Sequence, residues 1–525
     1  MSAASCDQPA WLAALLHNPA ALGDDVQCLQ THISWVLLAG SRAYKFKKPL
    51  SLGFLDFSTL DQRRAACLEE LRINRRTAPG IYETVVAVLG PVQELRLVSL
   101  DALEQDAEVL DYGVQMQRFA DDQLLTRQLA AGTLTSAHLD TLAQQVAHFH
   151  ARACATSAGS DWGSSTLVRQ QAHANFESLA SVPLPDTDRA HLADLRYWTQ
   201  HEGQRLAPLM AQRQGSGFVR ECHGDLHLGN LVLISGQPQL FDAIEFSQAL
   251  RWIDTVADTA FLFMDLHAQG RPDLAWQFLN GWLEHTGDYA ALALLPWYAV
   301  YRALVRAMVA GLRLAQAGDE ATRADSLAQV QRYLALAQQL RQPRARWLLL
   351  AHGVSGSGKS HHSARLSAER GVVRLRADVE RKRLFGLAPT AASAGVVPGG
   401  IYTPDATQRT YDHLTVLAAQ VLSAGYPVLV DATFLSHAHR AQFVALAVQK
   451  QVPCRILSFD APLDVLRERV ECRLRKGGNA SEATLVVLEA QLKCREPLDA
   501  GEQELAVRVD TSHPVDWVAL LPAMD

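Results

Sequence analysis

The spacing of apolar residues changes twice along the chain. From about residue 26 to 115, apolar runs of strand length alternate with turn residues, and a single helical stretch interrupts them. Strands are predicted over 35–39, 43–47, 85–89, 94–100 and 113–119, and a helix over 60–76. From about 120 to 340 the spacing becomes helical, with helices predicted over 134–150, 191–212, 251–267, 272–285 and within 295–340. This pattern predicts a two-lobed α+β domain with a β-rich small lobe and a helical large lobe.

The last third of the chain has a different pattern. A proline and a charge cluster interrupt the helical spacing at 338–346, and strands and helices then alternate regularly. Strands are predicted over 347–352, 372–375, 427–431 and 454–459, and helices from 359 and over 407–423, 436–450 and 463–475. Such alternation is typical of an α/β domain with a parallel sheet. We therefore predict a first domain over 1–340, with lobes of about 1–117 and 118–340, and a second domain over 345–525.

Composition narrows the functional classes. The 525 residues are sufficient for two to four domains with full cores, and the net charge of −6 argues against a nucleic-acid or membrane-surface partner. The eight cysteines include no CxxC pair, which favours reduced thiols over a disulfide frame or a zinc site. The N-terminal residues lack a signal-peptide pattern, and no apolar run has the length of a membrane span. We expect a cytoplasmic protein.

The segment from His223 to Asn230 has the pattern of a kinase catalytic loop. Asp225 and Asn230 are five residues apart, and Asp242 follows at the end of an apolar strand. In such loops the first aspartate accepts the proton of a substrate hydroxyl, while the asparagine and the second aspartate hold magnesium. Asp225 is therefore a candidate base, and Asn230 and Asp242 are candidate metal ligands.

A second phosphate-binding motif lies more than a hundred residues further on. An apolar strand leads into a complete GxxxxGKS sequence, in which the candidate nucleotide-binding residues are Gly353, Gly356, Gly358, Lys359 and Ser360. The glycines let backbone N–H groups surround phosphates, the lysine reaches the β and γ phosphates, and the serine hydroxyl binds magnesium. The sequence thus contains two separate motifs for binding nucleotide phosphates.

These motifs carry a family resemblance. The first part resembles the aminoglycoside-phosphotransferase-like branch of the protein-kinase fold. The second part resembles small P-loop kinases, a group that includes polynucleotide kinase, zeta-toxin and chloramphenicol-phosphotransferase relatives. The whole chain resembles a bacterial family described as bifunctional aminoglycoside phosphotransferase/ATP-binding proteins. The resemblance implies ATP and Mg²⁺ as cofactors, and it does not name the phosphoryl acceptor.

In the first domain, the resemblance implies that Lys45 on an A-x-K strand pairs the ATP phosphates. Glu70 or its neighbour Glu69 would hold that lysine, and Lys47 on the same strand face is the fallback. The chain departs from the kinase pattern because residues 30–34 replace the expected GxGxxG loop. Phe149, His150, Asp254 and Asp258 are interpreted as structural rather than catalytic.

In the second domain, Asp431 ends an apolar strand and suits the Walker-B role of orienting magnesium. The resemblance implies that Asp378 is the base that meets the acceptor hydroxyl. Arg469 and Arg473 lie four residues apart on one predicted helix face and would clamp the transferring phosphate. Tyr402 and Arg440 are weaker candidates for the acceptor site.

The leading hypothesis is an ATP-dependent phosphotransferase in which each domain transfers the γ-phosphoryl group to a hydroxyl of a small molecule. Two alternatives remain open. The kinase-like half could bind a ligand and regulate the P-loop half, or the P-loop half could be a toxin-like or nucleic-acid-end kinase. The oligomeric state and the acceptors are not predicted.

Overall fold

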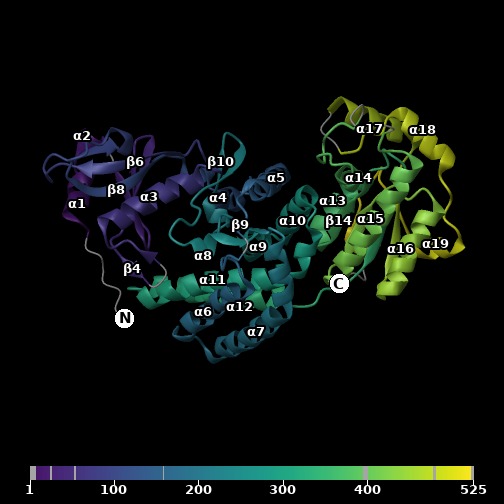
Figure 1. Ribbon diagram of the computed structural model, residues 1–525. Helices are drawn as coiled ribbons and strands as arrows, with labels where there is room; N and C mark the ends of the chain where they lie inside the picture. Colours follow the sequence, from purple (N-terminus) through teal and green to yellow (C-terminus); the bar gives the residue numbers. More distant parts are fainter. Residues whose placement is uncertain are drawn as a thin grey trace. The chain divides into compact units, whose positions relative to one another are not determined.

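The computed structural model describes residues 8–23, 26–52, 55–157, 159–393, 400–476 and 480–521 (Figure 1). The chain forms two compact units. The first unit comprises residues 1–142, 149–173 and 203–262, and the second comprises 143–148, 174–202 and 263–525. Helices that the sequence pattern assigns to the large lobe, among them α10 (Pro272–Thr286), therefore belong to the same compact unit as the P-loop.

An antiparallel six-stranded sheet forms the core of the first unit, in the order β1-β2-β3-β8-β6-β7. Its strands are β1 (Gln27–Gln30), β2 (Ser34–Ala39), β3 (Arg42–Lys47), β6 (Tyr82–Leu89), β7 (Arg96–Ser99) and β8 (Val109–Gln117). Side chains alternate along β3, so Tyr44 and Phe46 pack into a cluster with Trp11. Lys45 and Lys47 consequently face the opposite side, towards helix α3 (Leu60–Asn74).

Two short antiparallel pairs flank the predicted catalytic loop. Strand β9 (Val219–Glu221) pairs with β12 (Trp252–Asp254), and β10 (Leu231–Ile234) pairs with β11 (Gln237–Leu240). The helix predicted over 251–267 is wrong at its start, because β12 precedes helix α9 (Thr255–Ala268). Asp254 pairs with Arg213 at 2.7 Å and accepts a hydrogen bond from the Val256 N–H, which ties it to the start of α9.

The predicted helical stretch 295–340 is two helices, α11 (Leu295–Gln316) and α12 (Glu320–Leu340). Asp319 caps the second helix by accepting a hydrogen bond from the Thr322 N–H. Helix α6 (Ser165–Ala180) was not predicted from the sequence. No helix in the described ranges combines the length and the apolar character needed to cross a membrane.

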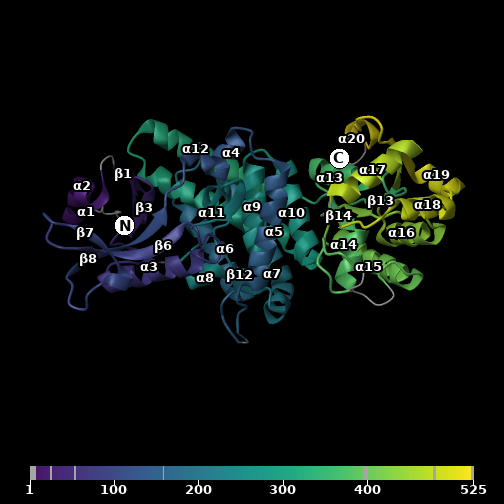
Figure 2. The same cartoon turned by 90° about the horizontal axis from the view of Figure 1, so that it is seen from above.

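A five-stranded parallel sheet forms the core around the P-loop, in the order β14-β15-β13-β16-β17. Its strands are β13 (Leu348–His352), β14 (Val373–Arg376), β15 (Val428–Asp431), β16 (Cys454–Asp460) and β17 (Ala506–Asp510). Leu366 of α13 (Lys359–Arg370) and Trp517 of α20 (Trp517–Leu520) pack against one face. Helix α15 (Pro404–Ser423) contacts β14 and β15, and Figure 2 shows the helices around this sheet.

Parallel strands bring the segments after their carboxyl ends to one edge of the sheet. The P-loop follows β13, Asp378 follows β14, and Asp431 ends β15. Three helices complete this edge: α14 (Ala377–Leu384), α17 (Leu463–Lys476) and α18 (Leu485–Cys494). Helices α14 and α18 and strand β17 were missed by the sequence pattern.

Candidate active sites

Lys45 lies between two carboxylates in the first unit. Its Nζ is 2.8 Å from Glu70 Oε1 and 2.5 Å from Asp242 Oδ1. Burial alone would lower the pKa of Lys45, but the charges of Asp242 and Glu70 outweigh burial and raise that pKa well above its usual value. Lys45 is therefore a fixed positive charge beside the predicted metal ligand Asp242.

The structure distinguishes between the candidates that the sequence left open. Glu70, rather than Glu69, contacts Lys45, because Glu69 instead pairs with Arg72 and Arg251. Lys47 is fully buried and pairs with Glu70 Oε2 at 2.5 Å and with Glu245. Burial raises the pKa of the Glu70 carboxyl, but the two lysines outweigh it and bring the pKa to about 2. Glu70 thus stays ionised and holds both lysines of β3.

The predicted catalytic loop places Asp225 and Asn230 in direct contact. Asn230 Nδ2 donates to Asp225 Oδ2 at 2.9 Å and to the Asp225 carbonyl at 3.0 Å. The side chains of Asp225 and Asp242 are 34% and 40% exposed, so both carboxylates can meet a ligand. Asp242 has a φ of 60°, which is uncommon outside glycine, and its N–H donates to the Tyr82 hydroxyl. This backbone conformation fixes the direction of the Asp242 side chain.

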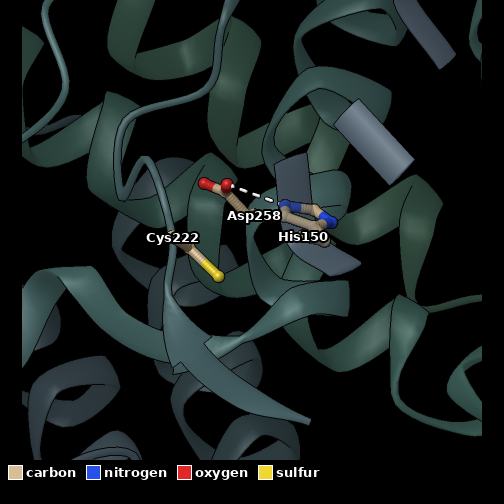
Figure 3. A group of neighbouring side chains, drawn as sticks. All are labelled: His150, Cys222 and Asp258. Carbon is tan, nitrogen blue, oxygen red and sulfur yellow. Dashed lines mark hydrogen bonds and ion pairs between the residues drawn. The ribbon is translucent and has the colours of Figure 1, made fainter. Parts of the chain in front are cut away.

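A buried aspartate braces the start of this loop (Figure 3). Asp258 accepts hydrogen bonds from the N–H groups of His223 and Gly224 at 3.1 and 3.0 Å, and its Oδ2 is 3.1 Å from His150 Nε2. Ligand atoms of His150, Cys222 and Asp258 lie within 4.8 Å of one another, as in a metal site. Both oxygens of Asp258 already accept hydrogen bonds, however, so the cluster supports the loop backbone. This geometry matches the structural role predicted for His150 and Asp258.

The second site is built around the P-loop after β13. Lys359 Nζ donates to the Val354 carbonyl at 2.8 Å, and Ser360 Oγ donates to Asp431 Oδ1 at 3.3 Å. Gly353 is required at its position, because a Cβ there would lie 2.6 Å from the Phe459 carbonyl oxygen. Burial lowers the pKa of Lys359 to about 8, although the nearby Asp431 and Asp378 oppose this shift.

One cavity of about 950 Å³ brings most of the predicted residues of the second site together, but Gly353 is not part of its lining. Its lining includes Gly356, Gly358, Lys359, Ser360, Asp378, Tyr402, Asp431, Arg469 and Arg473. Arg469 donates to the Thr511 hydroxyl and carbonyl at 2.8 Å each, and Arg473 donates to the Ala483 carbonyl at 2.9 Å. Arg440 is not part of this lining, because its buried guanidinium pairs with Glu502 at 2.7 Å.

Comparison with known proteins places the chain in a family. The AAA domain family matches residues 348–498. The uncharacterized proteins Rv2004c of Mycobacterium tuberculosis and Mb2027c of Mycobacterium bovis are each 31% identical over 489 residues, which is 92% of this chain and 92% of each relative. The chain belongs to the family of these mycobacterial proteins. The resemblance inferred from the motifs, to a family that joins a kinase-like domain to a P-loop domain, is confirmed.

Two solved structures are also similar to parts of the chain. A choline/ethanolamine kinase family protein from Mesorhizobium loti is 12% identical and covers 62% of this chain and 97% of its own, with a TM-score of 0.35. A gluconokinase from Sinorhizobium meliloti is 19% identical and covers 35% of this chain and 91% of its own, with a TM-score of 0.24. The sheets described above, rather than these distant structures, confirm the predicted fold classes: an α+β domain around an antiparallel sheet, and an α/β domain with a parallel sheet and a P-loop.

Family membership leaves open which residues outside the motifs build the P-loop site. Glu284 of α10 pairs with Arg374 Nη2 at 2.6 Å and with Arg376 Nη1 at 3.1 Å, and Arg376 lines the P-loop cavity. Burial raises the pKa of Glu284, but the two arginines outweigh it and lower the pKa overall. Asn280, one turn earlier, bonds to the Val372 carbonyl and the Arg374 N–H. Sequence reasoning missed both residues, since no motif surrounds them.

Both sites offer oxygen ligands that fit Mg²⁺ with ATP. In the second site, Asp431 Oδ2 is buried and has no hydrogen-bond partner among the described residues, and the Ser360 hydroxyl lies beside the other oxygen. An orphaned buried carboxylate oxygen is costly unless a cation or its water meets it. In the first site, Asn230 and Asp242 offer the oxygens. The residues present therefore fit the nucleotide and metal that the family resemblance implies.

Proposed function

We propose that the protein is an ATP-dependent phosphotransferase with two nucleotide sites, one in a kinase-like domain over 1–340 and one in a P-loop domain over 345–525. Each site transfers the γ-phosphoryl group of ATP to a hydroxyl of a small molecule. The observation that carries the proposal is that the P-loop residues Lys359 and Ser360, the acid Asp431 and the candidate base Asp378 line one cavity.

In the kinase-like site, Asp225 accepts the proton of the acceptor hydroxyl as the oxygen attacks the γ-phosphorus. The bond from that phosphorus to the bridging oxygen breaks, and ADP leaves with this oxygen. The hydrogen bond from Asn230 Nδ2 holds the Asp225 carboxylate in one orientation. Lys45 binds the ATP phosphates, and its contact with Glu70 keeps its ammonium group in place. Asn230 and Asp242 are the residues that would hold magnesium.

In the P-loop site, the backbone N–H groups of the loop and Lys359 bind the β and γ phosphates, and Ser360 with Asp431 would hold magnesium. Asp378 accepts the proton of the acceptor. Arg469 and Arg473 meet the charge that develops on the transferring phosphoryl group. When bound, ATP would supply the phosphoryl group in both sites, and magnesium would neutralise part of the phosphate charge.

A screen of a metabolite extract with γ-labelled ATP tests this proposal. The proteins compared are wild type, Asp225→Asn, Lys359→Ala and the double variant. We expect each single variant to lose a different set of labelled products and the double variant to lose all of them. Labelled products that persist unchanged in the double variant would contradict both site assignments.

One observation favours a regulatory role for the kinase-like half as a second candidate function. Helix α10 from the proposed first domain bonds to β14 beside the P-loop cavity, so a change in α10 can be transmitted to that cavity. Under this alternative, Asp225→Asn would leave every labelled product intact. A nucleic-acid-end kinase activity is tested by labelled phosphate transfer to oligonucleotide 5′ ends.

A further inference from the structure

The P-loop cavity contains cationic side chains that do not belong to the phosphate-binding motif. Lys359, Arg376, Arg381, Arg469 and Arg473 line it, against the carboxylates of Asp378, Asp431 and Glu482. Glu482 is already met by Lys382 at 3.2 Å and by the N–H and hydroxyl of Ser393. Arg376 likewise has Glu284 as its counter-charge. The remaining arginines therefore determine what else the cavity can hold.

Arg381 is a buried cation of this cavity that has no carboxylate partner among the described residues. It is 7% exposed, and its Nη1 donates only to neutral groups, the Ile401 carbonyl at 3.0 Å and the Thr407 hydroxyl at 3.1 Å. Its Nε is buried without a hydrogen-bond partner, and no carboxylate of the described residues forms an ion pair with it. A buried guanidinium without an anion is costly, because the charge has lost its water.

The position of Arg381 relates it to the acceptor rather than to ATP. Arg381 and Asp378 lie three residues apart on α14, so their side chains leave the same helix face about 4.5 Å apart along the axis. The guanidinium also lies over the Tyr402 ring, 5.0 Å from its centre, and Tyr402 lines the same cavity. The P-loop and Asp431 belong to other segments of the cavity wall.

We propose that the acceptor of the P-loop site is an anion, a hydroxyl compound with a carboxylate or phosphate group that Arg381 binds while Asp378 meets the hydroxyl. This inference rests on the proposed function of the site and adds the chemical class of its substrate. Arg381 is a specificity-determining residue in this account, since its planar N–H groups match a carboxylate or phosphate. Neutral and cationic acceptors would leave its charge unmet.

The test uses the full chain with Asp225→Asn, so that only the P-loop site turns over. Carboxylate probes are glycerate and gluconate, the phosphate probe is glycerol 3-phosphate, the neutral probes are glycerol and glucose, and the cationic probe is glucosamine. Two quantities are measured for each probe: phosphate transfer from labelled ATP, and the shift in Tm with a non-hydrolysable ATP analogue and Mg²⁺ present. Comparison of the carboxylate probes with glycerol 3-phosphate separates carboxylate from phosphate recognition.

We expect anionic probes to exceed their neutral and cationic counterparts in at least one of the two readouts. Arg381→Gln should raise the acceptor KM, or the concentration needed for the Tm shift, by about ten- to a hundredfold and leave the ATP KM within about twofold. Arg381→Lys keeps the positive charge but lacks the planar N–H groups of the guanidinium, so it should give a smaller loss. It also provides a second test if the glutamine variant misfolds. Arg365→Gln, at a half-exposed arginine of α13 outside the cavity lining, is the matched control.

The absence of an anion preference in both readouts would overturn the inference. Equal effects of Arg381→Gln on ATP and on the acceptor would overturn it as well. Lys359→Ala in the same Asp225→Asn background distinguishes failure of the proposed function of this site from failure of the proposed acceptor class. If ATP turnover does not depend on Lys359, the proposed function of this site fails; if it does and anions are not preferred, only the acceptor class is wrong.

Discussion

Glu284 Oε2 lies 3.1 Å from Arg376 Nη1, which joins helix α10 to the wall of the P-loop cavity. The two residues are 92 positions apart in the sequence, and α10 lies in the stretch that the sequence pattern assigns to the kinase-like domain. Glu284 also holds Arg374 of β14, the strand that leads to Asp378. The candidate base of the P-loop site is thus supported by residues from outside the P-loop domain as the motifs define it.

Removing the charge of Glu284 should destabilise this support. Glu284→Gln leaves two guanidinium groups, 12% and 20% exposed, without the carboxylate that pairs with them, so the free energy of unfolding should fall by about 3 to 5 kcal/mol. Turnover at the P-loop site should fall more than ATP affinity, because Arg376 and Asp378 shift while the loop stays in place. Denaturant unfolding measures the change in stability, and turnover assays with ATP titration compare the loss of turnover with the loss of ATP affinity. The control Glu369→Gln breaks a half-exposed pair with Arg365 and should cost no more than about 0.5 kcal/mol.

The kinase-like site should separate chemistry from nucleotide binding. Asp225→Asn preserves shape but removes the base, so turnover at this site should fall by roughly two to four orders of magnitude with ATP affinity little changed. Asp242→Ala removes both a metal ligand and a partner of Lys45, and should weaken Mg·ATP binding itself. Turnover rates and ATP dissociation constants are measured in the Lys359→Ala background, so that only the kinase-like site contributes. Equal losses of affinity in the two variants would show that Asp225 acts in binding rather than as a base.

The two sites should respond differently to pH. Burial lowers the pKa of Lys359 to about 8, so its ammonium form is present below pH 8 and is lost as the pH rises through that value. ATP affinity at the P-loop site should therefore weaken above about pH 8. The pKa of Lys45 is raised well above its usual value, so the kinase-like site should keep its affinity over the same range. ATP affinity is measured from pH 7 to 9.5 in Asp242→Ala, which reports on the P-loop site, and in Lys359→Ala, which reports on the kinase-like site. Parallel pH profiles of the two affinities would contradict this assignment.

Asp378 should be needed for transfer and not for hydrolysis. Asp378→Asn removes the acceptor base, while slow ATP hydrolysis by water requires only the P-loop, Asp431 and magnesium. We expect transfer to fall by roughly two to four orders of magnitude with background hydrolysis retained. Product analysis with labelled ATP distinguishes the two reactions. Full transfer activity in this variant would remove Asp378 from the acceptor site.

The sequence predicted the parts of the sites that depend on short-range motifs. The spacing of Asp225 and Asn230 and the P-loop around Lys359 are set within a few residues, and flanking apolar strands identify their context. The link between Glu284 and Arg376 depends on tertiary packing and has no local pattern. Strand β12 was missed for a related reason: residues 252–254 fit a helical pattern, and they are extended because β9 pairs with them. The prediction that Arg440 lines the acceptor site was wrong, because its buried side chain pairs with Glu502, 62 residues away. The sequence of its own helix does not indicate this contact.

ATP turnover by four versions of the 525-residue chain tests the claim of two active sites most directly. The proteins are wild type, Asp225→Asn, Lys359→Ala and the double variant, each assayed at saturating Mg·ATP with a metabolite extract as the acceptor source. The account predicts that each single variant retains part of the wild-type turnover and that the double variant retains at most about one per cent. Loss of all turnover in either single variant, or substantial turnover in the double variant, would contradict it.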